Sequence, residues 1–173
     1  MLTTDQKGAV AELAIAKRAA ELGVGVWSAQ TVERYDLIFD LRPRLVRVQC
    51  KWANRYGEVI IVRCRSHRRG RDGFLARSYS SEEVDAFAAY CPATGECYFL
   101  PIATFLGRTN IQLRLGATRN NQAQRINWAK DYEFAAKLVD RGAIAQLGER
   151  RAGSAKVAGS SPAGSTDQLH LLR

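Results

Sequence analysis

An acid, an amide and an amine stand at spacings that would let them act together. In the stretch YDLIFDLRPRLVRVQCKWA, residues 35–53, two runs of strand-forming residues flank Arg42-Pro43, a pair that is typical of a turn. If the turn is centred there, paired residues have numbers that sum to 85, and Asp36 lies opposite Gln49. Because side chains alternate along a strand, Lys51 shares the face of Gln49.

Such a set suits phosphate chemistry assisted by a hard cation. Mg²⁺ prefers oxygen ligands such as a carboxylate, an amide or backbone carbonyl, and water. Beside a phosphodiester it can polarise the phosphoryl oxygen and acidify a water nucleophile. A lysine adds positive charge for the transition state and can position or deprotonate that water. A surface salt bridge between Asp36 and Lys51, with Gln49 as a bystander, explains the spacing equally well, so the residues alone leave both interpretations open.

Composition narrows the possible functions. A chain of 173 residues is long enough for one domain, and its net charge of +9 indicates a polyanionic partner, either nucleic acid or an acidic membrane face. It has no long apolar run and its start, MLTTDQKG, is no signal peptide, so we expect a cytoplasmic protein that does not span a membrane. With only two histidines, Ser/His triads and His-based metal sites are disfavoured. The four cysteines lack a CxxC pair and are expected to be buried thiols.

The first element expected is a helix over residues 3–23, capped by Thr3 or Thr4 and ended by Gly23. Its expected apolar stripe is Val10, Leu13, Ala14, Ala16 and Leu22. Glu12 lies beside that stripe, and taken alone it is best interpreted as a solvated helix carboxylate.

The other expected elements are mainly strands. We expect strands over residues 24–32, 57–65, 96–101 and 109–115, a basic loop over 65–73, a helical turn leading into a strand over 80–91, and a closing helix over 128–140. In the opening hairpin, Val46, Val48, Cys50 and Trp52 form the face expected to enter the core.

A family resemblance now bears on the polar cluster. The order Glu12, Asp36, Gln49-Cys50-Lys51 resembles the active-site order of PD-(D/E)XK nucleases, with Tyr35 in place of the motif's proline. Gln49 replaces the usual acid, a variant also associated with Mrr-like restriction nucleases. The strings RYDLIFD, RVQCKWA, VRCRS, DAFAAYCPATGECYFLP, NNQ and INWAKDYE resemble the branch that contains group I intron homing endonucleases of bacteria, over roughly residues 5–137.

The resemblance implies an α/β, restriction-endonuclease-like core: a mixed central sheet flanked by helices, with an antiparallel extension. Asp36, the backbone carbonyl of Cys50 and Glu12 would hold Mg²⁺, Gln49 would give a neutral oxygen or orient a water, and Lys51 would assist the attacking water. The implied activity is cleavage of double-stranded DNA at a long specific site. Because one small domain has one active site, cutting both strands implies a homo-oligomer, a dimer or tetramer. The alternatives are a Holliday-junction resolvase, an Mrr-like nuclease, or a catalytically degenerate DNA-binding protein.

Two groups of polar residues are candidates for DNA contact. The first is a dense set of arginines: Arg63, Arg65, Arg68, Arg69, Arg71 and Arg77. The second is Arg119, Asn120, Asn121 and Gln122, with Arg108, Arg114 and Arg125 nearby. Amides and arginines can read adenine and guanine edges in the major groove, although loop amides more often cap turns.

The composition changes after residue 141. We expect a nuclease domain over residues 1–141 and a poorly ordered tail over 142–173, rich in Ala, Gly, Ser and Arg. The tail resembles a translated tRNA gene: AQLGER at residues 145–150 matches the D-arm consensus in one frame, and GSSP at 159–162 matches the T-arm in the same frame. A flexible basic linker is the alternative interpretation.

Overall fold

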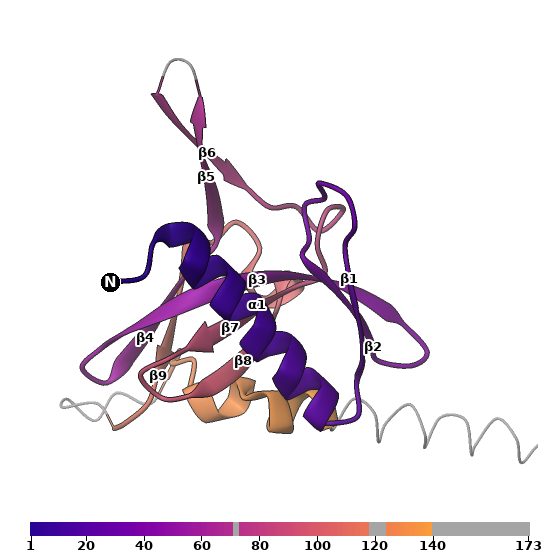
Figure 1. The fold of residues 1–173 in the computed structure, drawn as a ribbon. Helices are drawn as coiled ribbons and strands as arrows, with labels where there is room; N and C mark the ends of the chain where they lie inside the picture. The colour runs from indigo at the N-terminus through magenta and orange to yellow at the C-terminus, as the bar shows by residue number, and fades with distance from the viewer. Residues whose placement is uncertain (71–72, 118–123, 140–173) are drawn as a thin grey trace, which may run out of the picture.

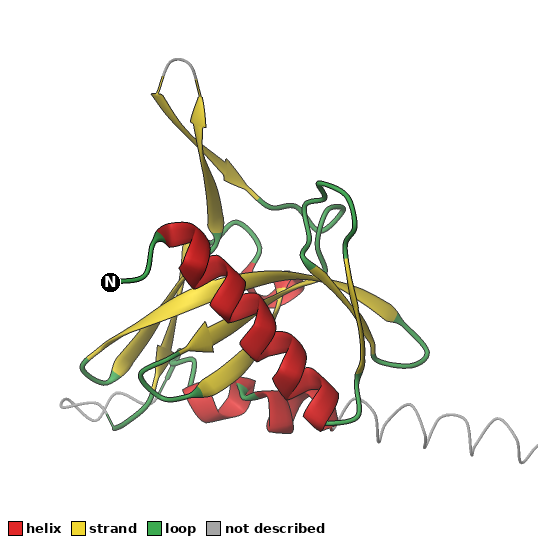
Figure 2. Ribbon diagram, in the orientation of Figure 1, coloured by secondary structure: helices red, strands yellow, loops and turns green. Residues whose placement is uncertain are grey.

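A mixed β-sheet with helix α1 laid across one face forms the body of the protein (Figures 1 and 2). The computed structural model describes residues 1–70, 73–117 and 124–139. The elements are α1 Thr4–Glu21, β1 Gly25–Ser28, β2 Leu37–Asp40, β3 Leu45–Tyr56, β4 Val59–Arg63, β5 Arg65–Gly70, β6 Gly73–Ser78, β7 Ala86–Cys91, β8 Glu96–Pro101, α2 Ile102–Phe105, β9 Asn110–Arg114 and the 3₁₀ helix η1 Ala129–Tyr132. A last helical stretch covers residues 134–139.

Seven strands form one sheet, in the order β1-β2-β3-β4-β9, with β7 beside β3 and β8 beside β7. The β3–β7 pair is parallel and the other pairs are antiparallel. The mixed sheet with an antiparallel extension is therefore as predicted. None of the helices in the described part of the chain is long and apolar enough to cross a membrane.

Helix α1 begins and ends where the sequence predicts. Thr3 is the N-cap, and its side chain accepts a hydrogen bond from the backbone N–H of Gln6, while the Gln6 side chain accepts from the N–H of Thr3. At the other end Gly23 takes a φ of 77°, a left-handed conformation that glycine adopts without steric cost.

The expected apolar stripe of α1 is only partly right: Ala16 and Leu22 pack against the core, whereas Val10 and Leu13 are exposed. The residues that α1 buries against the sheet are Ala11, Ile15 and Ala19, whereas Leu13 is 72% exposed. Their spacing of four residues forms a narrow ridge. Two of the three side chains are methyl groups, which lets the helix approach the sheet closely, and larger apolar residues fall to either side of the contact.

The opening hairpin has the predicted register. Leu37 pairs with Val48 and Phe39 with Val46, and each pair of numbers sums to 85. These four side chains are buried, and together with Cys50 they form a core layer against α1. A second layer, including Ile60, Val62 and Leu113, lies on the other side of the sheet. All four cysteines are buried and free, as predicted.

Two other expectations need correction. Most of the segment 65–73, predicted to be a loop, is strand: residues 65–70 form β5, which pairs with β6 from Arg65↔Ser78 to Gly70↔Gly73. This hairpin pairs with no strand of the seven-stranded sheet and projects from the body (Figure 1). The closing helix is interrupted: η1 ends at Tyr132, Glu133 forms a β-bridge with Tyr98, and the next helical stretch begins at residue 134.

Candidate active site

Asp36 directly precedes β2, at the end of the hairpin where Gln49 lies. Its backbone N–H donates to the carbonyl of Val48 at 3.0 Å, although Val48 is paired with Leu37, so Asp36 and Leu37 both face Val48 as at a β-bulge. Its Oδ2 accepts hydrogen bonds from the backbone N–H of Cys50 at 2.7 Å and from the Gln49 amide at 2.5 Å. The carboxylate and the amide therefore meet beside the bulge, one position beyond the last regular pair of the hairpin.

The Gln49 amide nitrogen also marks a point where two oxygens converge. Nε2 of Gln49 donates to Oδ2 of Asp36 at 2.5 Å and lies 3.4 Å from the carbonyl oxygen of Cys50. The second oxygen of Asp36, Oδ1, accepts no hydrogen bond from the described residues. A carboxylate and a carbonyl facing one positive N–H form the kind of oxygen cradle that a hard divalent cation requires. These residues thus fit such an ion, provided that the amide turns its oxygen toward it.

Glu12 brings a second carboxylate from α1. The pKa of Glu12 is raised, first by partial desolvation and then by the negative charge of Asp36. Burial also raises the pKa of Asp36, and it outweighs the Cys50 N–H, the charge of Lys51 and the Gln49 amide, which lower it. Both carboxyl groups have raised pKa values, and a cation bound between them would stabilise their ionised forms. The described residues contain no cluster of three or more His, Cys, Asp or Glu side chains suited to a metal, so the donor set needs the carbonyl and the amide as well.

Lys51 follows on β3, on the face of Gln49, and its ammonium is held by an aromatic side chain. Nζ donates to the phenol oxygen of Tyr79 at 3.0 Å and lies 4.7 Å from the centre of the Tyr79 ring. Tyr79 is buried, and its ring packs edge-on against Phe87 with centroids 5.4 Å apart. The lysine is thus presented next to Asp36 by a rigid aromatic support.

Arg34 contacts the same tyrosine from the loop before β2. Its guanidinium carbon lies 4.1 Å from the centre of the Tyr79 ring. Its two terminal nitrogens donate to the Ser66 hydroxyl at 3.1 Å and to the Ser78 carbonyl at 3.0 Å, and its Nε lies 3.2 Å from a carboxylate oxygen of Glu83. The Nε contact lacks hydrogen-bond geometry, so this buried nitrogen has no hydrogen-bond partner among the described residues. Arg34 therefore connects Tyr79 to the base of the β5–β6 hairpin.

Arg47 lies on the same face of β3 as Gln49, but its contacts stabilise the fold. Its backbone N–H and its guanidinium donate to both carboxylate oxygens of Asp85 at 2.8–3.0 Å. The guanidinium also donates to the backbone carbonyls of Ser81 and Glu82. These bonds join the start of β3 to the segment that leads into β7, so Arg47 is not free to contact a substrate.

The candidate DNA-contact residues fall into three groups. Arg63 ends β4, while Arg65, Arg68, Arg69 and Arg77 lie on the β5–β6 hairpin. Arg77 is committed to an ion pair with Glu83. Arg71, Arg119, Asn120, Asn121 and Gln122 lie outside the described residues, as does the tail over 142–173.

Sequence reasoning missed Tyr79 and Arg34. Tyr79 lies 28 residues beyond Lys51, and no motif or periodicity connects the two. Arg34 directly precedes the hairpin string, yet its partners Ser66 and Ser78 lie 32 and 44 residues away. The available signal was only their position: a tyrosine closing a basic segment and an arginine two residues before the candidate aspartate.

Comparison with known proteins matches the chain to a protein family and to solved structures. A family model described as PD-(D/E)XK endonuclease matches residues 2–135. A solved structure described as a bacterial homing endonuclease, I-Ssp6803I, matches with 26% sequence identity and a TM-score of 0.64, covering 87% of this chain and 99% of that chain. No curated protein sequence matches.

Proposed function

This chain belongs to the PD-(D/E)XK endonuclease family, and from that membership we propose that it is a homing-type enzyme that hydrolyses double-stranded DNA at a specific site with Mg²⁺. Its α/β fold is the restriction-endonuclease-like fold of that family, and it is a DNA endonuclease. The specific site, the choice of metal and the role of each residue are the proposal.

One observation carries the assignment of the site. Asp36 Oδ2 and the Cys50 carbonyl converge on a single amide N–H of Gln49, and Lys51 lies on the same face. In a plain surface salt bridge the carboxylate would face the ammonium. Here Lys51 instead binds Tyr79, and Asp36 faces Gln49 and the backbone of Cys50.

Each residue of the candidate active site has its own proposed role. Asp36, the Cys50 carbonyl and Glu12 would hold the cation, which when bound polarises a phosphoryl oxygen and acidifies a water. Gln49 would contribute its amide oxygen or orient that water. Lys51 would hold its ammonium toward the phosphate, where it stabilises negative charge that develops on the oxygens and positions the nucleophile. Because Gln49 is uncharged, the site carries one negative charge less than its acidic relatives, which favours a single cation.

The DNA partner is supported by charge and by the relative. The chain carries a net charge of +9, and arginines are dense on β5 and β6, which project from the body. The matched structure is described as a homing endonuclease, and the alignment spans nearly all of it. We further propose that the chain acts as a dimer or tetramer, because cutting two strands requires two active sites.

A cleavage assay distinguishes this function from its alternatives. Purified protein is incubated with duplex DNA that carries candidate insertion sites, and with branched DNA, in the presence and absence of Mg²⁺. Discrete duplex products that require Mg²⁺ support the homing-type enzyme. Cutting of branched DNA alone would indicate a junction resolvase, and binding without cutting would indicate a degenerate DNA-binding protein.

A further inference from the structure

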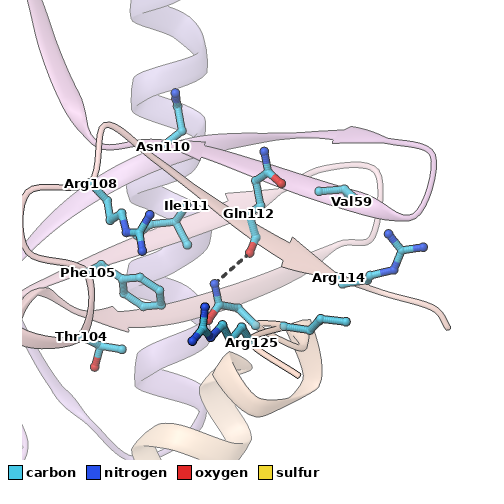
Figure 3. Close-up of a pocket in the computed structure, with 11 residues that line it drawn as sticks. Val59, Thr104, Phe105, Arg108, Asn110, Ile111, Gln112, Arg114 and Arg125 are labelled. Atoms are coloured by element: carbon cyan, nitrogen blue, oxygen red, sulfur yellow. Dashed lines mark hydrogen bonds between the residues drawn. The ribbon is translucent and has the colours of Figure 1, made fainter. Parts of the chain in front are cut away.

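A polar cavity lies beside β9 (Figure 3), and it shares no residue with the candidate active site. Its volume is about 710 Å³, and its polar lining includes Arg108, Asn110, Gln112, Arg114, Arg125 and Asn127. A smaller cavity of about 240 Å³ adjoins it and is lined by Arg63, Arg65, Thr109 and Asn110. Because the two cavities share Asn110, we treat them as one surface, the basic trough. Among the described residues, no acidic side chain lines it.

The trough gathers the arginines that have no partner. Most arginines whose side chains the structure describes are paired with a carboxylate: Arg18, Arg34, Arg42, Arg47, Arg55 and Arg77. Arg114 is held by the backbone carbonyls of Gly116 and Ala117 at 2.9 and 3.1 Å. In the described part of the chain, Arg63, Arg65, Arg108 and Arg125 make no side-chain hydrogen bond or ion pair, and the one other such arginine is Arg44 in the β2–β3 turn. Four unpaired guanidinium groups in one trough repel each other unless an external anion lies between them.

The backbone at Arg125 is a second, independent observation. Its φ of 57° makes it the one non-glycine residue with positive φ in the described part of the chain. This conformation is sterically unfavourable for a residue with a side chain. The segment that follows is tied to β9, because the Arg114 N–H donates to the Asn127 carbonyl at 2.8 Å and the Asn127 amide donates to the Gln112 carbonyl at 3.3 Å. The left-handed turn thus leaves Arg125 beside the cavity, on the side where Figure 3 shows Arg108. Backbone strain of this kind is concentrated at functional sites.

The trough also begins near the candidate active site. Cys64 joins Arg63 to Arg65, and its N–H donates to the Thr109 carbonyl at 2.8 Å. The β3–β4 ladder begins at the pair Ala53↔Val62, two residues from Lys51 on β3 and two residues from Cys64 after β4, so Lys51 and the start of the trough are neighbours. From this end the trough follows β9 away from the catalytic face.

We propose that the basic trough binds the phosphate backbone of the DNA that flanks the cleaved bond. The proposal rests on the proposed function, because the polyanion it names is the substrate DNA. Guanidinium groups bind phosphate oxygens through paired N–H donors. The five residues of β9 span about 13 Å at roughly 3.3 Å per residue, and phosphates of one strand recur about every 3.4 Å along the helix axis. The trough is therefore long enough to contact a few neighbouring phosphates.

The test neutralises the two unpaired arginines at the far end of the trough. Arg108→Gln and Arg125→Gln are combined in the full chain, and binding to a long random-sequence duplex is measured without divalent metal over a range of salt concentrations. The slope of log affinity against log salt is expected to become shallower by about 1.8, because each lost phosphate contact removes about 0.9. The matched control combines Arg42→Gln and Arg55→Gln, which removes the same charge from arginines already paired with Asp40 and Glu58.

Each outcome decides the proposal. A larger slope change in the trough variant than in the control supports it. Equal slope changes overturn it, since net charge alone would then explain the effect. An unchanged slope together with a smaller oligomer in sedimentation also overturns it, because the trough would then contact a second copy of the chain. The measurement needs no cleavage, so a protein that binds through the trough but never cuts would refute the proposed function alone.

Discussion

The phenol oxygen of Tyr79 lies 3.0 Å from Nζ of Lys51, and the ammonium also lies 4.7 Å from the centre of the same ring. A free lysine side chain has about 2 kcal/mol of rotamer entropy. Tyr79 removes much of that freedom before any substrate arrives. It is a positioning residue, because it acts on the phosphate only through Lys51.

Removing the phenol oxygen should therefore slow the chemical step. We expect Tyr79→Phe to lower the single-turnover cleavage rate at saturating DNA by roughly tenfold, the equivalent of about 1.4 kcal/mol. The affinity for DNA should stay unchanged. Tyr98→Phe is the matched control, because Tyr98 is also buried and its hydroxyl contacts Thr94, within the β7–β8 hairpin. The positioning role of Tyr79 is refuted if both variants cleave at the same rate, or if the lower rate of Tyr79→Phe results from a loss of DNA affinity.

Asp36→Ala and Lys51→Ala should each abolish cleavage and leave DNA binding largely intact. Each side chain is assigned to the cation or to the transition state, and loss of one such group costs roughly 10² to 10³ in rate or more. Single-turnover cleavage and a binding titration measure the two effects separately. Asp40→Ala and Lys130→Ala are the controls, since Asp40 pairs with Arg42 and Lys130 is exposed on η1. Near wild-type cleavage by both site variants would refute the assignment.

Gln49→Glu should make the protein more dependent on divalent metal. The change replaces the N–H that faces Asp36 Oδ2 and the Cys50 carbonyl with a charged oxygen. Loss of this donor should lower the free energy of unfolding by about 1–3 kcal/mol in metal-free buffer. Mg²⁺ should then raise the melting temperature more than it does for the wild type, because it binds the folded state alone. Gln6→Glu adds the same charge at the start of α1, where it is tolerated, and serves as the control. If Mg²⁺ raised the melting temperature equally in the two variants, a cation site formed by Asp36, the Cys50 carbonyl and residue 49 would be contradicted.

Asp85→Asn should destabilise the protein at neutral pH but not at strongly acidic pH. The hydrogen bond from Arg47 is the main reason why the pKa of Asp85 lies below its usual value. A carboxyl whose pKa is lowered on folding stabilises the protein above its ordinary pKa, and that contribution is lost as the pH falls through the lowered value. The pair is more than a third exposed at Asp85, so we expect about 1 kcal/mol at pH 7.

Thermal unfolding of wild type and Asp85→Asn at several pH values tests this. The variant should melt about 2–4 °C lower at neutral pH, and the two curves should converge below pH 4. Asp40→Asn removes a carboxylate whose partner Arg42 is 86% exposed, so it should change the melting temperature less. A difference that persists unchanged at low pH would show that the charge of Asp85 is not the cause.

Truncation after Arg141 should leave cleavage and DNA affinity at the level of the full chain. The reason is the resemblance of residues 142–173 to a translated tRNA gene, which predicts no catalytic or base-reading residue there. The gene itself gives an independent measurement, since codons 142–166 should fold as a tRNA cloverleaf. A nucleotide sequence unable to form those stems, or a truncated protein that loses cleavage, would end this interpretation.

Local signals made the hairpin predictable. Arg42-Pro43 marks the turn, and the alternation of apolar and polar residues on both sides fixes the register. The meeting of Asp36 with Gln49 lies one position beyond the last regular pair, Leu37↔Val48, where a bulge that the sequence does not signal alters the register. Helix α1 was equally clear at its ends, because a capping residue and a glycine are local signals.

Features that depend on distant contacts were not accessible in this way. The buried ridge Ala11, Ile15 and Ala19 was missed because large apolar residues dominate a periodicity count, whereas the close fit of α1 to the sheet selects small ones. The β5–β6 hairpin has no alternating apolar face, so its sequence reads as a loop. Arg34 and Tyr79 meet Lys51 only after the whole chain has folded.

The separation of the β5–β6 hairpin from the seven-stranded sheet has a consequence for how such a protein changes over generations. Among the described residues, β5 and β6 pair only with each other. A hairpin of another length or sequence therefore breaks no backbone hydrogen bond of the seven-stranded sheet. Under the proposed function, a new DNA-contacting hairpin can thus be acquired by exchanging one segment while the candidate active site is inherited intact. The condition is that the replacement keeps, at its base, the hydroxyl of Ser66 and the carbonyl of Ser78 that Arg34 binds.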